Sequence, residues 1–249
     1  MPAKALQALH PGERTNSSGK AVKNKLLLSI PDSEYALIRH ELEFMPMPHR
    51  LSLYEPNRKI DSAYFLNRGM ISLVIVTEDG RTVEASVVGK EGIGGLAATV
   101  GLTRSSMREV IQIAGEGFRI SASALQTALR TAPTFRMILG RYSVVQQMHI
   151  AQTAACNRLH ELVERLARWL LVTQDRVDSG WLPITHDFLA TMLGTDRPSV
   201  TLAASVLRKK NILDFTRGAV RIINRKKLED CACECYGVIQ QFNGELGLK

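Results

Sequence analysis

Several features are missing from this 249-residue sequence, and each absence excludes a class of protein. No apolar run approaches the roughly 20 residues that a membrane-spanning helix needs. The N-terminus also lacks the pattern of a secretory signal. We therefore expect a cytoplasmic protein that does not bind a membrane. The 4 cysteines are too few for a disulfide scaffold in a chain of this length.

Enzyme motifs are absent as well. The sequence contains no G-x-S-x-G, H-E-x-x-H, Walker or Rossmann fingerprint. The glycines between Gly89 and Gly95 are spaced too irregularly for a phosphate-binding loop. His149 and His160 are isolated histidines, which favours packing over haem ligation. We expect neither an enzyme nor a resident cofactor.

What the sequence does contain is a basic, well-balanced composition. The hydrophobic fraction is 45%, and the mean hydropathy is −0.04, which is sufficient for a folded core. The length suggests one large or two ordinary domains. The net charge of +8 favours a polyanionic partner, although charge alone does not choose between DNA, RNA and a membrane surface.

The most informative stretch runs from Thr185 to Asn211 and is typical of two helices joined by a tight turn. Apolar residues recur at helical spacing in the first helix, and Gly194 stands where that helix must end. Thr195 or Asp196 can cap the second helix, whose first turn contains Pro198. Its apolar face holds Val200, Ala203, Ala204 and Leu207, and its polar face holds Arg197, Thr201, Ser205 and Arg208. In a helix-turn-helix one such face packs and the other enters the major groove.

The residues after this helix predict a wing. Residues 212–215 and 219–223 are typical of strands, with a turn between them. From Arg197 to Lys227 there are nine Lys or Arg and one acid, Asp214, which favours contact with phosphates. A helical hairpin with a solvated basic end is the alternative, and the wing argues against it. We predict that bases are contacted from the face of Arg197, Ser199, Thr201 and Ser205, and phosphates by Arg208, Lys209, Lys210, Arg217 and Arg221.

The first half of the chain predicts a β domain. Residues 1–20 are polar and aperiodic, which predicts a flexible tail. A helix is predicted from Asp32 to about Leu42. From about residue 50 to 120, short strands alternate with turns, including Asn67-Arg68-Gly69 and Glu78-Asp79-Gly80. This pattern predicts a closed or jelly-roll β domain.

A long helix is predicted to begin at Pro133 and to end in a hinge at Asn157-Arg158. Along it, residues recur at alternating spacings of three and four, which is the spacing of a two-helix seam. The members of this seam are Phe135, Ile138, Tyr142, Val145, His149 and Gln152. Because two of them are polar, we predict a homodimer interface here. Burial of the helix inside its own subunit is the alternative.

From Leu27 to about Tyr236, the order of these elements resembles the cAMP receptor protein/FNR (Crp/Fnr) superfamily of bacterial transcription regulators. The resemblance is carried by Gly69 and Asp79-Gly80, by the run Glu164 to Leu171, and by Arg197-Pro198-Ser199-Val200. It implies an α+β protein with a cyclic-nucleotide-binding-like β-roll at 21–132, a dimerisation helix at 133–158, a winged helix-turn-helix at 159–236 and a C-terminal tail at 237–249.

The resemblance also implies a homodimer that binds double-stranded DNA at an inverted repeat, with RNA polymerase as a further partner. In the family the recognition helix begins with an arginine that reads guanine, and Arg197 takes that place. Pro198 and Leu202 stand where the best-known members have glutamate and arginine. We therefore expect the operator to differ from the best-known consensus.

A cyclic nucleotide is disfavoured as the effector. In the family, a glutamate after a turn glycine holds the ribose 2′-OH, and an Arg-Ser pair holds the cyclic phosphate. Arg104 and Ser105 match that pair and Gly94 a turn glycine, but no carboxylate follows the glycine. The hydroxyl pair that meets adenine would fall on Ile150 and Ala151. An unpartnered buried hydroxyl loses about 1–3 kcal/mol, and an exposed loop arginine is the alternative interpretation of Arg104.

Cys231-Ala232-Cys233-Glu234-Cys235 invites a metal interpretation. Zinc and iron–sulfur sites usually use C-x₂-C spacing and a second group of ligands. Cys156 is far off in sequence, and the N-terminal cysteine group of FNR-type oxygen sensors is absent. We therefore predict no metal site. Redox sensing by these thiols stays open, because Lys226 and Lys227 could depress a thiol pKa.

Overall fold

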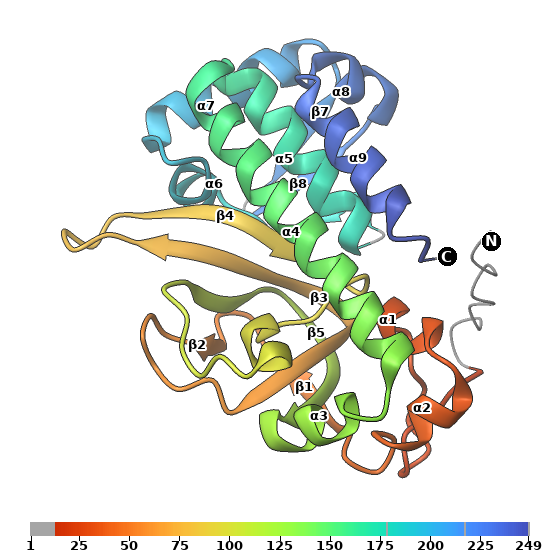
Figure 1. The fold of residues 1–249 in the computed structure, drawn as a ribbon. Coiled ribbons are helices and arrows are strands. Elements are labelled where there is room, and N and C mark those ends of the chain that lie inside the picture. The colour runs from red at the N-terminus through yellow and green to blue at the C-terminus, as the bar shows by residue number, and fades with distance from the viewer. Residues whose placement is uncertain (1–12, 178, 217, 249) are drawn as a thin grey trace.

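The computed structural model describes residues 13–177, 179–216 and 218–248, and it has an α+β fold (Figure 1). A β domain formed by the first part of the chain lies below a helical C-terminal domain, and the long helix α4 (Pro133–Leu159) connects them. Among the described residues, no helix is both long enough and apolar enough to cross a membrane.

Residues 13–20 are anchored to the β domain, which corrects the prediction of a flexible tail for this part. The Arg14 side chain is buried, and its guanidinium donates to the Ile30 carbonyl at 3.1 Å and to the Asp32 carboxylate at 2.6 Å. Asn16, also buried, donates to the Leu42 carbonyl at 2.9 Å. Residues 1–12 lie outside the described part.

Two short helices and a strand follow. α1 (Lys25–Ser29) is capped by Asn24, whose side chain accepts a hydrogen bond from the Leu27 amide. α2 (Asp32–Ala36) is shorter than the helix predicted to reach about residue 42, because the chain then enters β1 (Glu43–Met47) at the sheet edge. Proline is tolerated at such an edge.

The β domain is a curled antiparallel sheet with the strand order β1-β5-β3-β4. Its strands are β1, β2 (Ser52–Tyr54), β3 (Ser62–Val76), β4 (Thr82–Val88) and β5 (Arg108–Ser121), with the 3₁₀ helix η1 (Leu96–Val100) between β4 and β5. β2 pairs with β5 off the main path. The Glu78–Gly80 turn joins β3 to β4 as predicted. The β-roll prediction is confirmed.

The predicted turn at Gly69 is wrong. Gly69 instead forms a bulge inside β3. The register between β3 and β5 shifts on both sides of Arg68, and Gly69 has a φ of 93°. A Cβ at Gly69 would lie 2.6 Å from the Ile113 carbonyl oxygen. The absent side chain therefore lets β3 bend without leaving its partner strand.

Helix α3 (Ala122–Leu129) leads into α4, whose start is fixed by an acid from α2. The buried Glu34 carboxylate accepts from the amides of Thr134 at 3.0 Å and Phe135 at 2.7 Å. A carboxylate at this position satisfies free amides and complements the positive end of the helix dipole.

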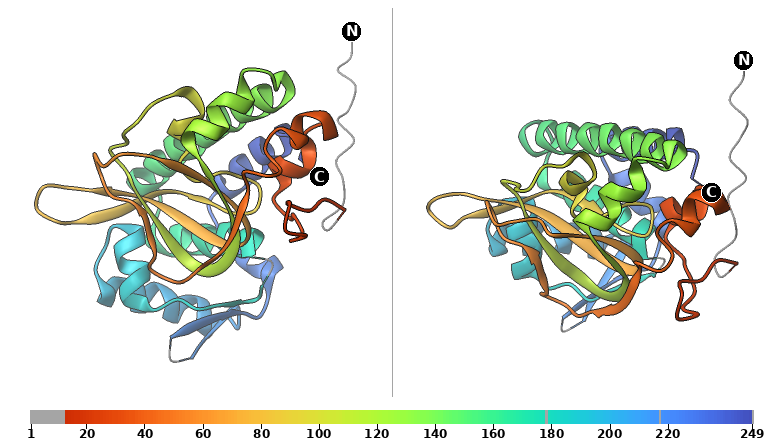
Figure 2. Two further views of the ribbon diagram at one scale, coloured as in Figure 1. Left: turned by 90° about the horizontal axis from the view of Figure 1, so that it is seen from below. Right: turned by 60° about the horizontal axis from the view of Figure 1, so that its bottom comes forward.

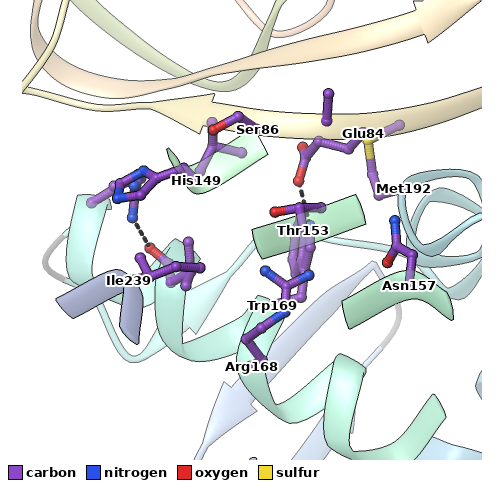
Figure 3. Close-up of a pocket in the computed structure, with 13 residues that line it drawn as sticks. Glu84, Ser86, His149, Thr153, Asn157, Arg168, Trp169, Met192 and Ile239 are labelled. Carbon is purple, nitrogen blue, oxygen red and sulfur yellow. Dashed lines mark hydrogen bonds between the residues drawn. The ribbon is translucent and has the colours of Figure 1, made fainter. Parts of the chain in front are cut away.

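The predicted dimer seam on α4 is wrong, because those residues are buried against their own chain. Exposed fractions are 7% or less for Phe135, Ile138, Tyr142, Val145 and His149. The first four of these residues belong to the apolar core of the β domain. His149 bonds the Ile239 backbone (Figure 3), and burial lowers its pKa to about 4. Gln152 donates to the Cys235 sulfur at 3.0 Å. The alternative, burial within one subunit, is the correct one.

The opposite face of α4 is open and mostly apolar, with Arg141 as the charged residue in its line. Met137, Val144 and Met148 are 50%, 49% and 38% exposed. Ala151 and Ala155, also exposed, continue the same line. Figure 2 shows α4 along one edge of the molecule, consistent with this outer face.

The C-terminal domain contains a helix-turn-helix and a wing. Its elements are α5 (Leu162–Val177), β6 (Trp181–Leu182), α6 (His186–Leu193), α7 (Arg197–Lys209), β7 (Leu213–Thr216), β8 (Ala219–Ile222), α8 (Arg225–Cys231) and α9 (Cys235–Glu245). The strands follow the order β6-β8-β7. The break after α4 falls at His160 and Glu161, because the helix continues through the hinge predicted at 157–158.

Helix α9 replaces the C-terminal tail predicted for 237–249. It lies beside α4, with Ile239 buried in the core of the C-terminal domain. Just beyond it, Leu246 is buried in the core of the β domain. The end of the described chain therefore returns to the first domain.

The two domains share an apolar core at the β3–β4 hairpin. Met70, Val74 and Val87 of the β domain lie in the same cluster as the buried residues of α5, α6 and α7. Within this contact the Trp169 indole donates to the buried Glu84 carboxylate at 2.6 Å (Figure 3). Ser72 donates to the same carboxylate at 2.5 Å. Nearby, Arg176 and Glu91 form an ion pair at 3.2 Å. The orientation of the C-terminal domain is set by this contact.

Glu84 gives a prediction of pH-dependent stability. Burial raises the pKa of its carboxyl from 4.5 to about 7, so the folded protein keeps a proton that the unfolded chain loses earlier. The resulting stabilisation is complete below pH 4.5 and is lost as the pH rises through about 7. Glu84→Gln, which stays neutral, should remove on the order of 3 kcal/mol of this pH dependence. Urea unfolding from mildly acidic to mildly basic pH measures it.

Part of the pH dependence should remain in the variant, because burial also raises the pKa of Glu109 to about 7. The control is Glu78→Gln, which changes an exposed carboxylate in the β3–β4 turn. This control should keep the wild-type dependence on pH. An equal loss in both variants would contradict the role assigned to Glu84.

Candidate nucleic-acid interface and cysteine–histidine cluster

The turn between α6 and α7 is built from a left-handed glycine and an acidic cap. Gly194 has a φ of 62° and ends α6. The Asp196 carboxylate accepts from the Ser199 amide at 2.8 Å and so begins α7. Of the two predicted caps, Asp196 is therefore the one used. A Cβ on Gly194 would also lie 3.2 Å from a Val83 methyl group, so the turn sits directly against β4.

The division of α7 into two faces is as predicted. Val200, Ala203, Ala204 and Leu207 are buried in the domain core. The opposite face exposes Arg197, Thr201, Leu202, Ser205 and Val206, with Arg208 and Lys209 in the last turn. Among the described residues, this is a helix with one packed face and one accessible face.

Local contacts already hold several of the predicted base-contacting side chains. Arg197 lies 3.5 Å from the Asp187 carboxylate, and both side chains are about two-thirds exposed. The Thr201 hydroxyl donates to the Arg197 carbonyl and lies 3.0 Å from the His186 ring nitrogen. The Ser199 hydroxyl donates to Asp196 at 2.8 Å, so it completes the cap.

The predicted phosphate contacts are distributed over the end of α7 and the wing. Lys209 and Lys210 are exposed, and Arg208 lies 3.9 Å from the Asp214 carboxylate. On β8, the Arg221 guanidinium lies 5.3 Å from the centre of the Trp181 ring. Arg217 lies outside the described residues. The short strand β6, which carries Trp181, was not predicted, because two residues give no strand periodicity.

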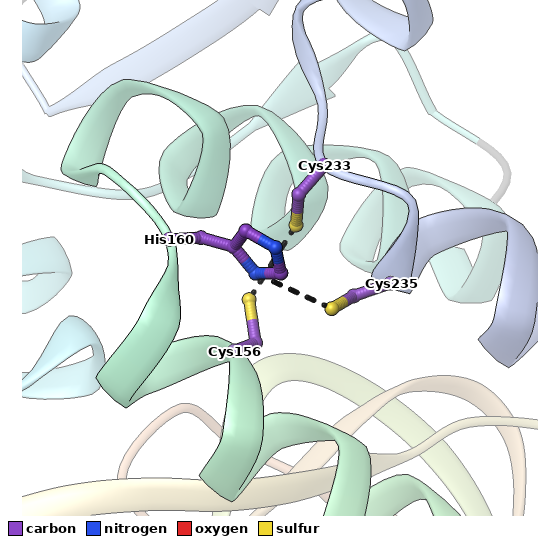
Figure 4. A group of neighbouring side chains, drawn as sticks. All are labelled: Cys156, His160, Cys233 and Cys235. Carbon is purple, nitrogen blue, oxygen red and sulfur yellow. Dashed lines mark hydrogen bonds between the residues drawn. The ribbon is translucent and has the colours of Figure 1, made fainter.

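A second site lies where α4 ends. Cys156, His160, Cys233 and Cys235 bring their side chains together there (Figure 4), with all four ligand-type atoms within 4.8 Å of one another. The Cys156 and Cys233 sulfurs are 3.5 Å apart, and the Cys235 sulfur is 3.5 Å from His160 Nδ1. Cys231 lies outside this group, and all four cysteines are free thiols.

Burial and hydrogen bonding shape the group. The three cysteines are 6% exposed or less. The hydrogen bond with Cys233 lowers the pKa of the Cys156 thiol to about 5, and the same interaction raises the pKa of Cys233. His160 Nε2 lies 3.1 Å from the Glu234 carboxylate. The prediction of no metal site relied on the C-x-C-x-C spacing and on the sequence distance to Cys156, and the structure removes the second of these grounds.

Comparisons with known proteins agree with this architecture. Residues 164–231 match the model of the Crp-like helix-turn-helix domain. FixK2 from Bradyrhizobium japonicum is 17% identical, with 77% of this chain and 98% of FixK2 covered and a TM-score of 0.67. The c-di-GMP responsive global regulator CLP from Xanthomonas campestris is 16% identical, with coverages of 78% and 100% and a TM-score of 0.65. No curated protein matches the sequence.

A third structure is similar to the same extent. A transcriptional regulator of the CRP family from Thermus thermophilus is 20% identical, with 76% of this chain and 96% of that regulator covered and a TM-score of 0.62. At these identities the likeness is one of fold, and the matched domain adds the type of DNA-binding unit. The chain therefore has the fold of these proteins, and its residues 164–231 form a Crp-like helix-turn-helix domain.

The residues predicted to bind an effector lie in different surroundings. Arg104 is exposed and donates to the Asn57 carbonyl at 3.2 Å. Ser105 is half-exposed and accepts from the Met107 amide. Gly94 is buried, and a Cβ there would lie 2.8 Å from Ile71. Effector binding by these residues stays a prediction.

Proposed function

We propose that this chain is a Crp/Fnr-type transcription regulator that acts as a cytoplasmic homodimer and binds an inverted-repeat operator through α7. The observation that carries the proposal is the exposed face of α7, which begins at Arg197 and ends in the basic run Arg208 to Lys210. In helix-turn-helix proteins such a helix enters the major groove with its first residues at the bases.

Arg197 is the proposed base reader. Its guanidinium can donate two hydrogen bonds to O6 and N7 of one guanine. It pairs with Asp187 at the surface, where an ion pair is worth little, so DNA can replace that partner at small cost. Thr201 and Ser205 follow on the same face. Lys209, Lys210 and Arg221, together with Arg217 from the sequence, are proposed to contact phosphates and set the docking position.

The outer face of α4 is the proposed dimer interface. Met137, Val144, Met148, Ala151 and Ala155, with the exposed Arg141 between the first two, follow the alternating spacing of a two-helix seam and are exposed in the single chain. A second copy of α4 would cover these apolar side chains. The proposal therefore keeps the homodimer and moves its interface to the other side of the helix.

The effector is proposed to be something other than cAMP. The turn after Gly94 carries no carboxylate for a ribose hydroxyl, and Arg104 is exposed and hydrogen-bonded to its own loop. On α4, Ala151 stands at one of the two positions where a hydroxyl would contact adenine. It carries no hydroxyl, and it lies on the outer face, away from the β domain core.

Base reading and positioning should separate in two variants. Arg197→Ala should weaken operator binding by roughly 1–3 kcal/mol per half-site and relax specificity at one base pair in each. The half-site centres should lie about 34–36 Å apart. Lys209→Ala is the control, and it should weaken all DNA alike and reduce the salt slope by about one. Affinities for a selected operator and its single-base variants, across salt concentrations, measure both. The docking would be contradicted if Arg197→Ala weakened every sequence equally.

The dimer interface should respond to charge on one face of α4 alone. Val144→Glu with Met148→Glu should give a folded monomer by light scattering and circular dichroism, with loss of tight operator binding. Ala154→Glu, which places the same charge roughly 80° around the helix from Val144, should stay dimeric. Ile138→Glu should instead lose folded protein, because Ile138 is 3% exposed within its own subunit. A dimer that survives the double substitution would rule out this face.

Calorimetric titration with cAMP and with cGMP should give weak or undetectable heat of binding. Arg104→Ala should leave that result unchanged, because its side chain is already bound to the surface loop. Micromolar affinity for cAMP that disappears in Arg104→Ala would contradict this prediction and restore the cyclic-nucleotide interpretation.

A further inference from the structure

We propose that Cys156, His160, Cys233 and Cys235 form a binding site for a single four-coordinate metal ion, and that the ion is Zn²⁺. Cys156 comes from the last turn of α4, His160 from the joint that follows it, Cys233 from the link between α8 and α9, and Cys235 from the first position of α9. The side chains converge on one point in Figure 4.

The spacing of the donor atoms fits one tetrahedral ion. With Zn–S bonds of about 2.3 Å and Zn–N bonds of about 2.0–2.1 Å, the ligand atoms of a tetrahedron lie about 3.6–3.8 Å apart. The separations of 3.5 Å for Cys156–Cys233 and for Cys235–His160 are close to these values. All ligand atoms lie within 4.8 Å of one another, which is too close for each ligand to bind a different iron of an iron–sulfur cluster.

The chemistry of the donors points to the same ion. Three thiol groups and one imidazole are a donor set that structural zinc sites use. Thiolates select soft or borderline metals over calcium and magnesium, and a tetrahedral arrangement of sulfur and nitrogen favours zinc. Because all three cysteines are buried, water cannot reach the ion as an additional ligand and give it a different geometry.

The surroundings of the ligands are those of a metal site as well. His160 turns Nδ1 toward the cysteines and Nε2 toward the Glu234 carboxylate, at 3.1 Å. A metal-bound histidine usually donates its other ring N–H to a carboxylate in this way. The Gln152 amide donates to the Cys235 sulfur at 3.0 Å, which suits a thiolate. Glu234 and Gln152 therefore orient the ligands from outside the group.

An ion here would fasten the joint between the two domains. His160 occupies the break between α4 and α5, and the two cysteines precede the body of α9, which runs back along α4. Binding of a structural ion contributes directly to folding free energy. Zinc would therefore fix the course of the chain on both sides of the DNA-binding domain.

Metal content tests the site without reference to DNA. The full-length protein, purified anaerobically with a reductant, should contain about one zinc ion per chain, measured by inductively coupled plasma mass spectrometry. Cys156→Ser and Cys233→Ser should lose it. Cys231→Ser is the matched control and should retain it, because this thiol lies outside the group. Loss of zinc from all three variants alike, or a metal-free wild-type protein that binds no added Zn²⁺, would overturn the proposal.

Two measurements keep the test independent of how the variants fold. Chelation of the wild-type protein followed by titration with Co²⁺ should give the visible absorption bands of tetrahedral cobalt and the charge-transfer bands of thiolate ligands. Glu234→Ala, which removes no ligand, should weaken zinc affinity about 10–100-fold. Octahedral cobalt spectra, inorganic sulfide with iron, or a Cys156–Cys233 disulfide in the reduced preparation would each contradict a zinc site. Failure of operator binding with the zinc present would count against the proposed function alone.

Discussion

One face of α4 is covered by its own chain from Phe135 to Cys156, and the other elements take their positions from that contact. Near its start the helix closes the core of the β domain through Phe135 and Tyr142. In the middle His149 meets α9, and at the end Cys156 meets the segment after α8. Because a helix rises about 1.5 Å per residue, these three contacts are held at fixed separations along about 30 Å.

The second consequence of this arrangement is that the domains are not independent bodies. The β3–β4 hairpin contributes Val74 and Val87 to the core that holds the helix-turn-helix, and Gly194 lies against Val83 at the turn itself. A rotation of the DNA-binding domain must break this apolar contact and the Trp169–Glu84 hydrogen bond together. Any ligand that turned the DNA-binding domain would have to offset the cost of that separation.

Local periodicity allowed the sequence to predict the β domain, the long helix and both faces of α7. Burial of Val200, Ala203, Ala204 and Leu207 follows from spacing alone. The same kind of spacing misled on α4, because period identifies a face and not what covers it. Both sides of that helix repeat at three and four, and the larger side chains pack inside the subunit. Position around the helix had to come from the tertiary structure.

The cysteine–histidine cluster shows the other limit of sequence reasoning. Cys156 and Cys233 are 77 residues apart, and no local pattern connects them. Their contact depends on α9 returning along α4, and the sequence of residues 237–249 suggested a tail. Glu34, which begins α4 from 100 residues away, was missed for the same reason. Contacts of this range follow from the path of the whole chain.

The return of α9 to the β domain has a consequence for synthesis of the protein. Leu246 is buried in the core of the first domain, with Phe242 and Leu248 packed beside it. Domains generally fold in order as they leave the ribosome, the N-terminal one first. Here the first domain lacks part of its core until residues 242–248 have been made. The β domain and the DNA-binding domain therefore reach their final packing together, late in synthesis, although they are consecutive modules in the sequence.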